Sequence, residues 1–418
     1  MFAQIRYAWS RGCAWWSTGI LWVHRLWFDD EASATDCFWW LDVLFLLGGI
    51  RSSSTSKWAQ ERLIRIIFQS LFASNIIVFY LQLVEDWNSK EDASLIIMEV
   101  TKITGISISF LRMVAAAMLI EPFTTLRRFV SGNSVNSGDA QYDECERNKF
   151  NRFARTAMTL IVMWITTDTI LFAIPSSTKD ELFKFPLMLS AIGETASRIL
   201  NIVLVSCIPA CVFPKTAGCT AYIAVLLKGM RMKLRMLAHR FERITGQSAL
   251  CEDKYFDHVN WEVRHALLQH LEYWKYLDIL KDLVGKVFLL VHYFSIFAIG
   301  AMFYVCREVR ISFMTVIYIA GLAFSLSEYF LLCYLIDSLQ DEADSLEQHI
   351  FEICALVPFR PERRSEYVQW RTTLMTIWIN TRNGMSMWCS GLFEINTSQF
   401  VAVLNIAYSM LTFLLQMG

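Results

Sequence analysis

The end of the chain carries a regular row of polar side chains. Residues 398–417 (SQFVAVLNIAYSMLTFLLQM) contain no charge and are about long enough to cross a ~30 Å hydrocarbon core as a helix. Hydroxyl and amide dipoles can hold a hydrated cation weakly, as the wall of a conducting pore requires. Lipid penalises polar groups, so a pore wall and a polar seam packed against another helix are both open interpretations. The polar residues recur at intervals that place them on one helical stripe: Ser398, Asn405, Ser409, Thr412 and Gln416.

Four ionisable residues interrupt apolar runs elsewhere: Arg112, Asp168, His292 and Glu328. Inside a membrane such groups are costly unless they are paired or hydrated, so they mark either a functional site or structural pairs. We favour structural pairing, and the sequence does not identify the partners. If Asp168 lines a pocket, it favours ligands with a hydroxyl or an amine.

Other chemistries find little support. Histidines 258, 265 and 270 are spaced by seven and five residues, which does not gather them on one helix face, so we expect a solvated face and no metal site. The 11 cysteines include no CxxC pair and predict no disulfide framework. No nucleotide loop, catalytic triad or paired carboxylates occur, so neither an enzyme nor a cofactor is expected.

Composition indicates a membrane protein. Hydrophobic residues make up 55% of the 418 residues and charged residues 18%, and the mean hydropathy is +0.37. Soluble domains contain about 25% charged residues. We therefore predict an all-α membrane protein. A net charge of −1 gives no reason to expect a nucleic-acid partner.

The apolar runs predict seven transmembrane helices. Segment 37–49 is too short to span and carries Asp42, so we expect it to be half-inserted. Pro209 and Pro214 should break and kink span four, and residues 121–151 read as a loop. The predicted order is a cytosolic N-terminus (1–62), spans one to four (63–227), a cytosolic helical extension (228–286), spans five and six (287–336), a cytosolic helical region (337–396) and span seven (397–418).

Most of the 38 lysines and arginines fall before span one and in the connections after spans two, four and six. The positive-inside rule therefore places the N-terminus in the cytosol and the C-terminus outside. That orientation is the reverse of a G-protein-coupled receptor. No internal repeat appears, which disfavours an inverted-repeat transporter.

The terminal stretch also carries a family signature. Its residues fit the pattern F-x-x-[VI]-L-x-x-x-Y-S-x-x-T, and with residues 267–274 and 330–339 the chain resembles the insect odorant receptor family. A gustatory-receptor ending is matched only in part. The connection 228–286 leaves little room for the long insertion of the Orco co-receptor, so the chain looks like a ligand-tuning subunit. The signature residues are Phe400, Val403, Leu404, Tyr408, Ser409 and Thr412.

This resemblance implies an odorant-gated, non-selective cation channel in the plasma membrane of olfactory neuron dendrites. Family members assemble as tetramers around one pore, in which tuning subunits join Orco, and the cytosolic helices hold the subunits together. The last helix lines the pore, so the resemblance favours the pore interpretation of the polar stripe. We expect Asn405, Ser409, Thr412 and Gln416 to face the cations, and Phe413 and Met417 to form an apolar constriction.

The resemblance also places the odorant site in the outer half of spans two, three, four and six. An apolar, aromatic-lined cavity suits a small volatile molecule. Ordinary helix packing is the alternative for each candidate, and Trp164 and Tyr318 are the strongest. The candidates are Ile106, Trp164, Thr167, Asp168, Leu171, Leu200, Val203, Tyr318, Leu322 and Phe324.

Two other functions remain open. A gustatory-type receptor channel would work without Orco, and a secondary transporter would show saturable uptake without channel-sized current. Current recordings with and without Orco separate all three.

Overall fold

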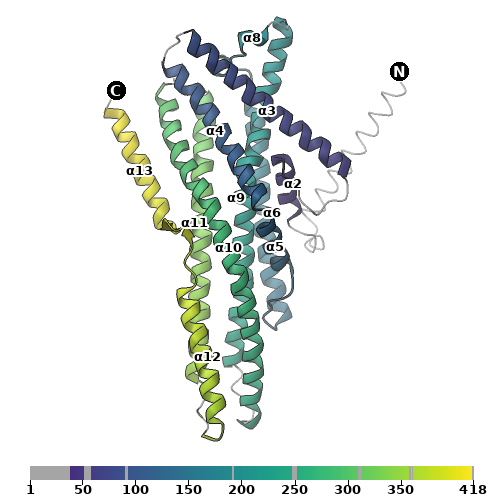
Figure 1. Ribbon diagram of the computed structural model, residues 1–418, viewed down its shortest axis with the longest axis vertical. Helices are drawn as coiled ribbons and strands as arrows, with labels where there is room; N and C mark the ends of the chain where they lie inside the picture. Colours follow the sequence, from purple (N-terminus) through teal and green to yellow (C-terminus); the bar gives the residue numbers. More distant parts are fainter. Residues whose placement is uncertain are drawn as a thin grey trace, which may run out of the picture.

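The computed structural model describes residues 38–50, 58–89, 93–190, 193–246, 252–308, 313–356, 359 and 361–416. The described chain is almost entirely helical, as predicted. Three long helices run along an elongated bundle, α9 (Glu194–Gly246), α10 (Glu252–Glu308) and α11 (Phe313–Leu356) (Figure 1). Their lengths of 53, 57 and 44 residues exceed the roughly 20 residues that crossing a membrane needs. These helices therefore project well beyond a bilayer.

Within the described residues, six helices are long and apolar enough to span a membrane. They are the three long helices together with α3 (Trp58–Asn88), α4 (Ala93–Met118) and α6 (Ala140–Ala173). The chain is therefore a multi-pass membrane protein. The seventh predicted span coincides with α13 (Thr397–Gln416).

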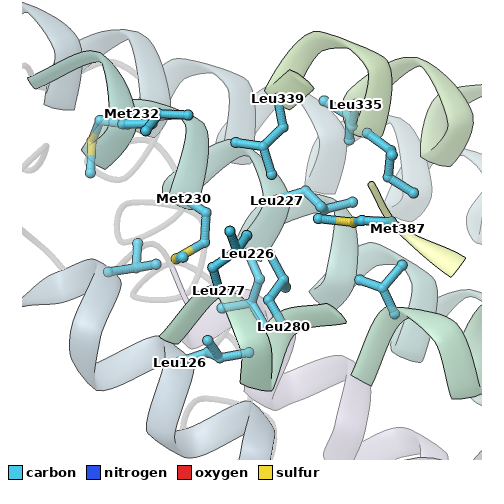
Figure 2. Packing of buried hydrophobic residues seen from close by; sticks show 14 of the residues in the cluster. Leu126, Leu226, Leu227, Met230, Met232, Leu277, Leu280, Leu335, Leu339 and Met387 are labelled. Carbon is cyan, nitrogen blue, oxygen red and sulfur yellow. The ribbon is translucent and has the colours of Figure 1, made fainter. Parts of the chain in front are cut away.

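The half of the bundle drawn at the bottom of Figure 1 is a tight apolar core; it is called the inner half because the sequence predicts it on the cytosolic side, and the other half is called the outer half. In the inner half α9, α10 and α11 pack together, and α12 (Arg364–Asn383) packs on α11 and contacts α10. Leu277, Leu280 and Leu283 of α10 are all fully buried, at helical spacing. Figure 2 shows Leu277 and Leu280 meeting Leu226, Leu227 and other residues of this core. Each such leucine stabilises the fold by about 1.5–3 kcal/mol.

Two predictions were wrong, one about the connection 121–151 and one about span four. Much of 121–151 is helical, because α5 (Ile120–Ser131) buries Phe123 and Leu126 one turn apart and α6 already begins at Ala140. The Asp139 carboxylate caps α6 by accepting from two backbone N–H groups. Span four is not broken either, because α9 continues through both of its prolines. Packing inside a bundle makes such prolines tolerable.

The short N-terminal segment forms α2 (Trp39–Gly48), which packs into the bundle. Asp42 forms an ion pair with Arg127, 2.8 Å between Oδ2 and Nη1. Phe45 stacks on Tyr222 of α9 with 4.9 Å between ring centroids. Half-insertion into the membrane stays a prediction.

The histidines of the predicted cytosolic extension do not share one environment. His265 is exposed, and the side chain of residue 258 lies outside the described residues. His270 is buried, stacks on Trp274 and hydrogen-bonds Thr381 of α12 at 3.0 Å. The expectation of a solvated face was therefore wrong for His270, which packs α10 against α12.

A small hairpin leads into the last helix. Strands β1 (Trp388–Cys389) and β2 (Phe393–Glu394) pair antiparallel, with Trp388 opposite Glu394. The hairpin lies directly on Gly285 of α10, where an added Cβ would meet the Trp388 carbonyl oxygen at 2.6 Å. Only glycine allows this approach.

Candidate functional site

A cavity of about 280 Å³ lies among the outer parts of α3, α4, α6, α9, α10 and α11. Pockets for small molecules begin at about 300 Å³, so the cavity suits a compact ligand. Its lining is mostly apolar and rich in aromatic side chains. The lining residues are Phe79, Met98, Thr101, Lys102, Gly105, Ile106, Ser109, Phe172, Phe183, Ile208, Val212, Phe213, Thr216, Phe294, Phe297, Ala298, Ala301, Tyr318, Gly321, Phe324, Ser325 and Glu328.

Lys102 closes the outer end of the cavity. Its ammonium donates to the Glu99 carboxylate and to the carbonyl of Leu182, the last residue of α7 (Ser177–Leu182). The ammonium also lies over the rings of Phe79 and Phe183, 5.5 and 5.0 Å from their centroids. Cation–π and hydrogen-bond contacts together hold the end of α7 and the residue after it over the cavity.

A buried ion pair forms the inner end. Arg112 of α4 reaches Glu328 of α11, with 3.2 Å between Nη2 and Oε2, and its Nη1 also donates to the Thr216 carbonyl at 3.1 Å. The guanidinium lies 4.8 Å from the centroid of the Phe294 ring. Arg112 is 2% exposed and Glu328 8%. Each charge offsets the cost of burying the other.

The other two ionisable residues singled out in the sequence, His292 and Asp168, lie apart from this pair. His292 shares a 2.9 Å hydrogen bond with the Tyr329 hydroxyl. Asp168 is buried but does not line the cavity.

The predicted ligand residues divide into two groups. Ile106, Tyr318 and Phe324 line the cavity, whereas the other seven do not. Trp164 lies behind the wall, with its ring 5.3 Å from that of Phe324. The remaining residues occupy other surroundings: Leu171 and Leu322 pack against buried clusters, Asp168 is buried, and Thr167, Leu200 and Val203 are exposed.

Sequence reasoning missed the contributions of spans one and five. Phe79 comes from α3, and α10 supplies a face formed by Phe294, Phe297, Ala298 and Ala301. These four positions follow the i, i+3, i+4, i+7 pattern of one helix face. That pattern of large and small apolar residues is the signal that could have found them.

The last helix presents its polar stripe away from its own chain. Val403 and Ala407 are buried, whereas Asn405 and Ser409 are exposed and Thr412 is half-buried. At 3.6 residues per turn, the centre of the polar stripe lies roughly 180° from the buried face. In Figure 1, α13 stands at the edge of the bundle.

The polar groups on α13 keep acceptor capacity. The Ser409 hydroxyl donates to the Asn405 carbonyl at 2.9 Å, and the Thr412 hydroxyl oxygen is 3.0 Å from the Tyr408 carbonyl. A hydroxyl that donates inside its helix still offers oxygen lone pairs outward. For Phe413 and Gln416 the backbone is helical and the side chains lie outside the described residues, as does the whole of residue 417.

α11 connects the cavity to α13. The Asp337 carboxylate accepts from the backbone N–H of Thr397 at 2.9 Å and from its hydroxyl, at the first turn of α13. A second cap is local, because the Asn396 side chain accepts from the Gln399 N–H at 3.1 Å. A carboxylate at a helix N-terminus stabilises that end.

Comparisons with known proteins agree with this architecture. The family model for the 7tm Odorant receptor matches residues 98–408. The structure of the insect olfactory receptor OR5 from Machilis hrabei is similar, with a TM-score of 0.71 and 12% sequence identity over 90% of this chain and 97% of that one. OR5 in complex with eugenol gives a TM-score of 0.70, with the same identity and coverage. No curated protein sequence matches the chain.

Proposed function

The chain belongs to the 7tm odorant receptor family, and we propose that it is the ligand-tuning subunit of an odorant-gated, non-selective cation channel. The observation that carries the proposal is the polar stripe of α13, which lies opposite the face that the helix buries against its own chain. Such a face requires water or other subunits around it. A central pore, shared by several copies of this helix, supplies both.

The outer cavity supports the ligand half of the proposal. Its aromatic walls and its volume fit a compact, mostly apolar molecule. The similar OR5 structure was solved in complex with eugenol. We propose that a small volatile odorant binds among α3, α4, α6, α9, α10 and α11 in this chain.

The partner in the proposed channel is Orco. α9 ends at Gly246 and α10 begins at Glu252, a connection too short for the long insertion that marks the co-receptor. Large apolar side chains beside the polar stripe, including Val401 and Tyr408, are exposed in the single chain. They suit neighbouring subunits or lipid, as a helix in a shared pore requires.

Cysteine accessibility on α13 tests the pore assignment. With Orco co-expressed, Asn405→Cys and Ser409→Cys should be modified by a charged, water-soluble methanethiosulfonate reagent, which should reduce the odorant-evoked current. Val403→Cys, on the buried face, is the matched control and should behave as the unsubstituted channel does. Modification of the Val403→Cys variant alone would overturn the assignment.

Ion selectivity gives a second readout. Gln416→Ala should change cation selectivity or rectification while surface expression persists, because it removes an amide dipole from the predicted stripe. Unchanged permeation would contradict the place of Gln416 in the pore. Odorant currents without Orco would instead contradict the proposed partnership.

A further inference from the structure

Glu328 has spare hydrogen-bonding capacity beside the cavity. Both Arg112 nitrogens contact the same carboxylate oxygen, Oε2, at 3.2 and 3.3 Å. The other oxygen, Oε1, is buried and has no hydrogen-bond partner among the described residues. A buried carboxylate oxygen without a donor is unfavourable. Because Glu328 lines the cavity and the terminal torsion of glutamate is soft, its carboxylate can turn Oε1 toward a bound molecule.

Nearby polar groups of the cavity already have partners within the chain. The Ser109 hydroxyl donates to the Gly105 carbonyl at 2.9 Å, and the Thr216 hydroxyl donates to the Phe213 carbonyl at 3.0 Å. Lys102 is occupied at the opposite end. Of the buried side-chain nitrogen and oxygen atoms without a partner in the described residues, the one that belongs to a cavity-lining residue is Glu328 Oε1.

The charge balance at the inner end restricts what can donate. Arg112 neutralises Glu328, so the pair has no net charge to attract a cation. An ammonium ligand would have to shed its water and lie near the guanidinium, which repels it. A hydroxyl group loses little solvation by comparison, and a hydrogen bond to a charged acceptor is stronger than one between neutral groups.

We propose that this cavity selects small neutral molecules that carry a hydroxyl group, an alcohol or a phenol, whose O–H donates to Glu328 Oε1. The inference rests on the proposed function, since it names the ligand class of the same cavity. The aromatic walls hold the apolar body of the ligand, and Glu328 fixes its orientation.

Matched ligand pairs test the proposal. In cells that co-express this chain and Orco, p-cresol should activate at about 10- to 100-fold lower concentration than 4-methylanisole, because methylation removes the donor. Benzyl alcohol should likewise activate at a lower concentration than benzylamine, which is protonated at neutral pH. Equal sensitivity to p-cresol and 4-methylanisole would overturn the proposal.

A double substitution separates recognition from folding. Arg112→Leu combined with Glu328→Leu replaces the ion pair by apolar side chains, which buried sites often tolerate. The p-cresol preference should fall to within about threefold, with the 4-methylanisole response retained. The matched control removes a different, partly buried ion pair, Asp42→Leu with Arg127→Leu, and should keep the preference. A preference that survives the Arg112/Glu328 double substitution would refute the role of Glu328.

A binding measurement distinguishes this inference from the proposed function. Purified chain should show a larger thermal shift with p-cresol than with 4-methylanisole at equal concentration. If that preference appears but no ligand evokes current, the channel function fails and the inference stands. If currents appear with no preference in either assay, the inference fails and the channel function stands.

Discussion

The two halves of the bundle are built from the same long helices but differ in how tightly these helices pack. In the inner half, α9, α10 and α11 bury many leucine and methionine side chains, and α12 adds Leu374 and Ile377 to the same core. In the outer half, α9, α10 and α11 separate around a cavity of about 280 Å³, and large apolar side chains such as Leu160 and Ile199 are exposed where lipid would lie. A core at crystal-like density resists change, whereas incomplete packing leaves room for a ligand.

The difference teaches how one helix can serve both tasks. α11 lines the cavity with Tyr318, Phe324 and Glu328, then enters the inner core and holds α13 through Asp337. If the proposed ligand shifts the outer part of α11, the densely packed inner part should stay in place. The contact at Asp337 lies between the two parts, so we expect such a shift to reach α13, the proposed pore helix.

The largest expected effect comes from weakening the inner half. Leu280→Ala removes a fully buried side chain of α10 and should cost about 2–5 kcal/mol of stability. That is a large share of a typical total of about 5–15 kcal/mol. Surface expression and the thermal unfolding midpoint of the purified protein should both fall markedly.

Leu160→Ala is the matched control in the outer half, since Leu160 of α6 is 59% exposed. This substitution should change neither the surface expression nor the thermal unfolding midpoint by much. Equal losses from the two substitutions would contradict the contrast between a dense inner half and an open outer half.

A smaller effect is expected where the halves meet. Asp337→Ala removes the carboxylate that caps α13 from α11. Losing a helix cap costs about 0.5–2 kcal/mol, so odorant sensitivity should fall by about 2- to 30-fold with binding to the purified protein unchanged. Patch-clamp dose–response curves and thermal shifts measure the two quantities separately.

Thr397→Ser is the companion control, because it retains both the backbone N–H and a hydroxyl for Asp337. Its sensitivity should match that of the unsubstituted channel. If Asp337→Ala weakens binding and gating equally, then Asp337 does not couple the two halves.

The fold could be predicted from the sequence more fully than the candidate site. Long apolar runs and charged stretches with helical periodicity predicted the transmembrane helices and their extensions, because length and periodicity alone specify these features. α5 was missed because its apolar residues, including Phe123 and Leu126, lie within a polar stretch that resembles a loop. Its helical period was present but was outweighed by composition.

The cavity depends on how helices rotate against one another, which no local pattern fixes. Arg112 and Glu328 are separated by 216 positions, and each was visible only as a costly charge until the fold brought them together. The same limit explains Trp164 and Phe172. Both lie on span three, and the rotation of α6 gives the cavity Phe172 instead of Trp164.

The smallest effects are expected from substituting Tyr318 and Trp164, the two strongest ligand-site candidates from the sequence. Tyr318 lines the cavity, whereas Trp164 reaches it only through Phe324. Tyr318→Ala should therefore reorder the ranking of agonists by size, because the vacated space admits some ligands and loosens others. Trp164→Ala should lower sensitivity to all agonists by a similar factor, since it removes support from the wall without changing the groups that face the ligand. Dose–response curves over a panel of volatile molecules measure both. A reordered ranking in the Trp164→Ala variant, with an unchanged ranking in the Tyr318→Ala variant, would mean that the ligand binds beside Trp164 and outside this cavity.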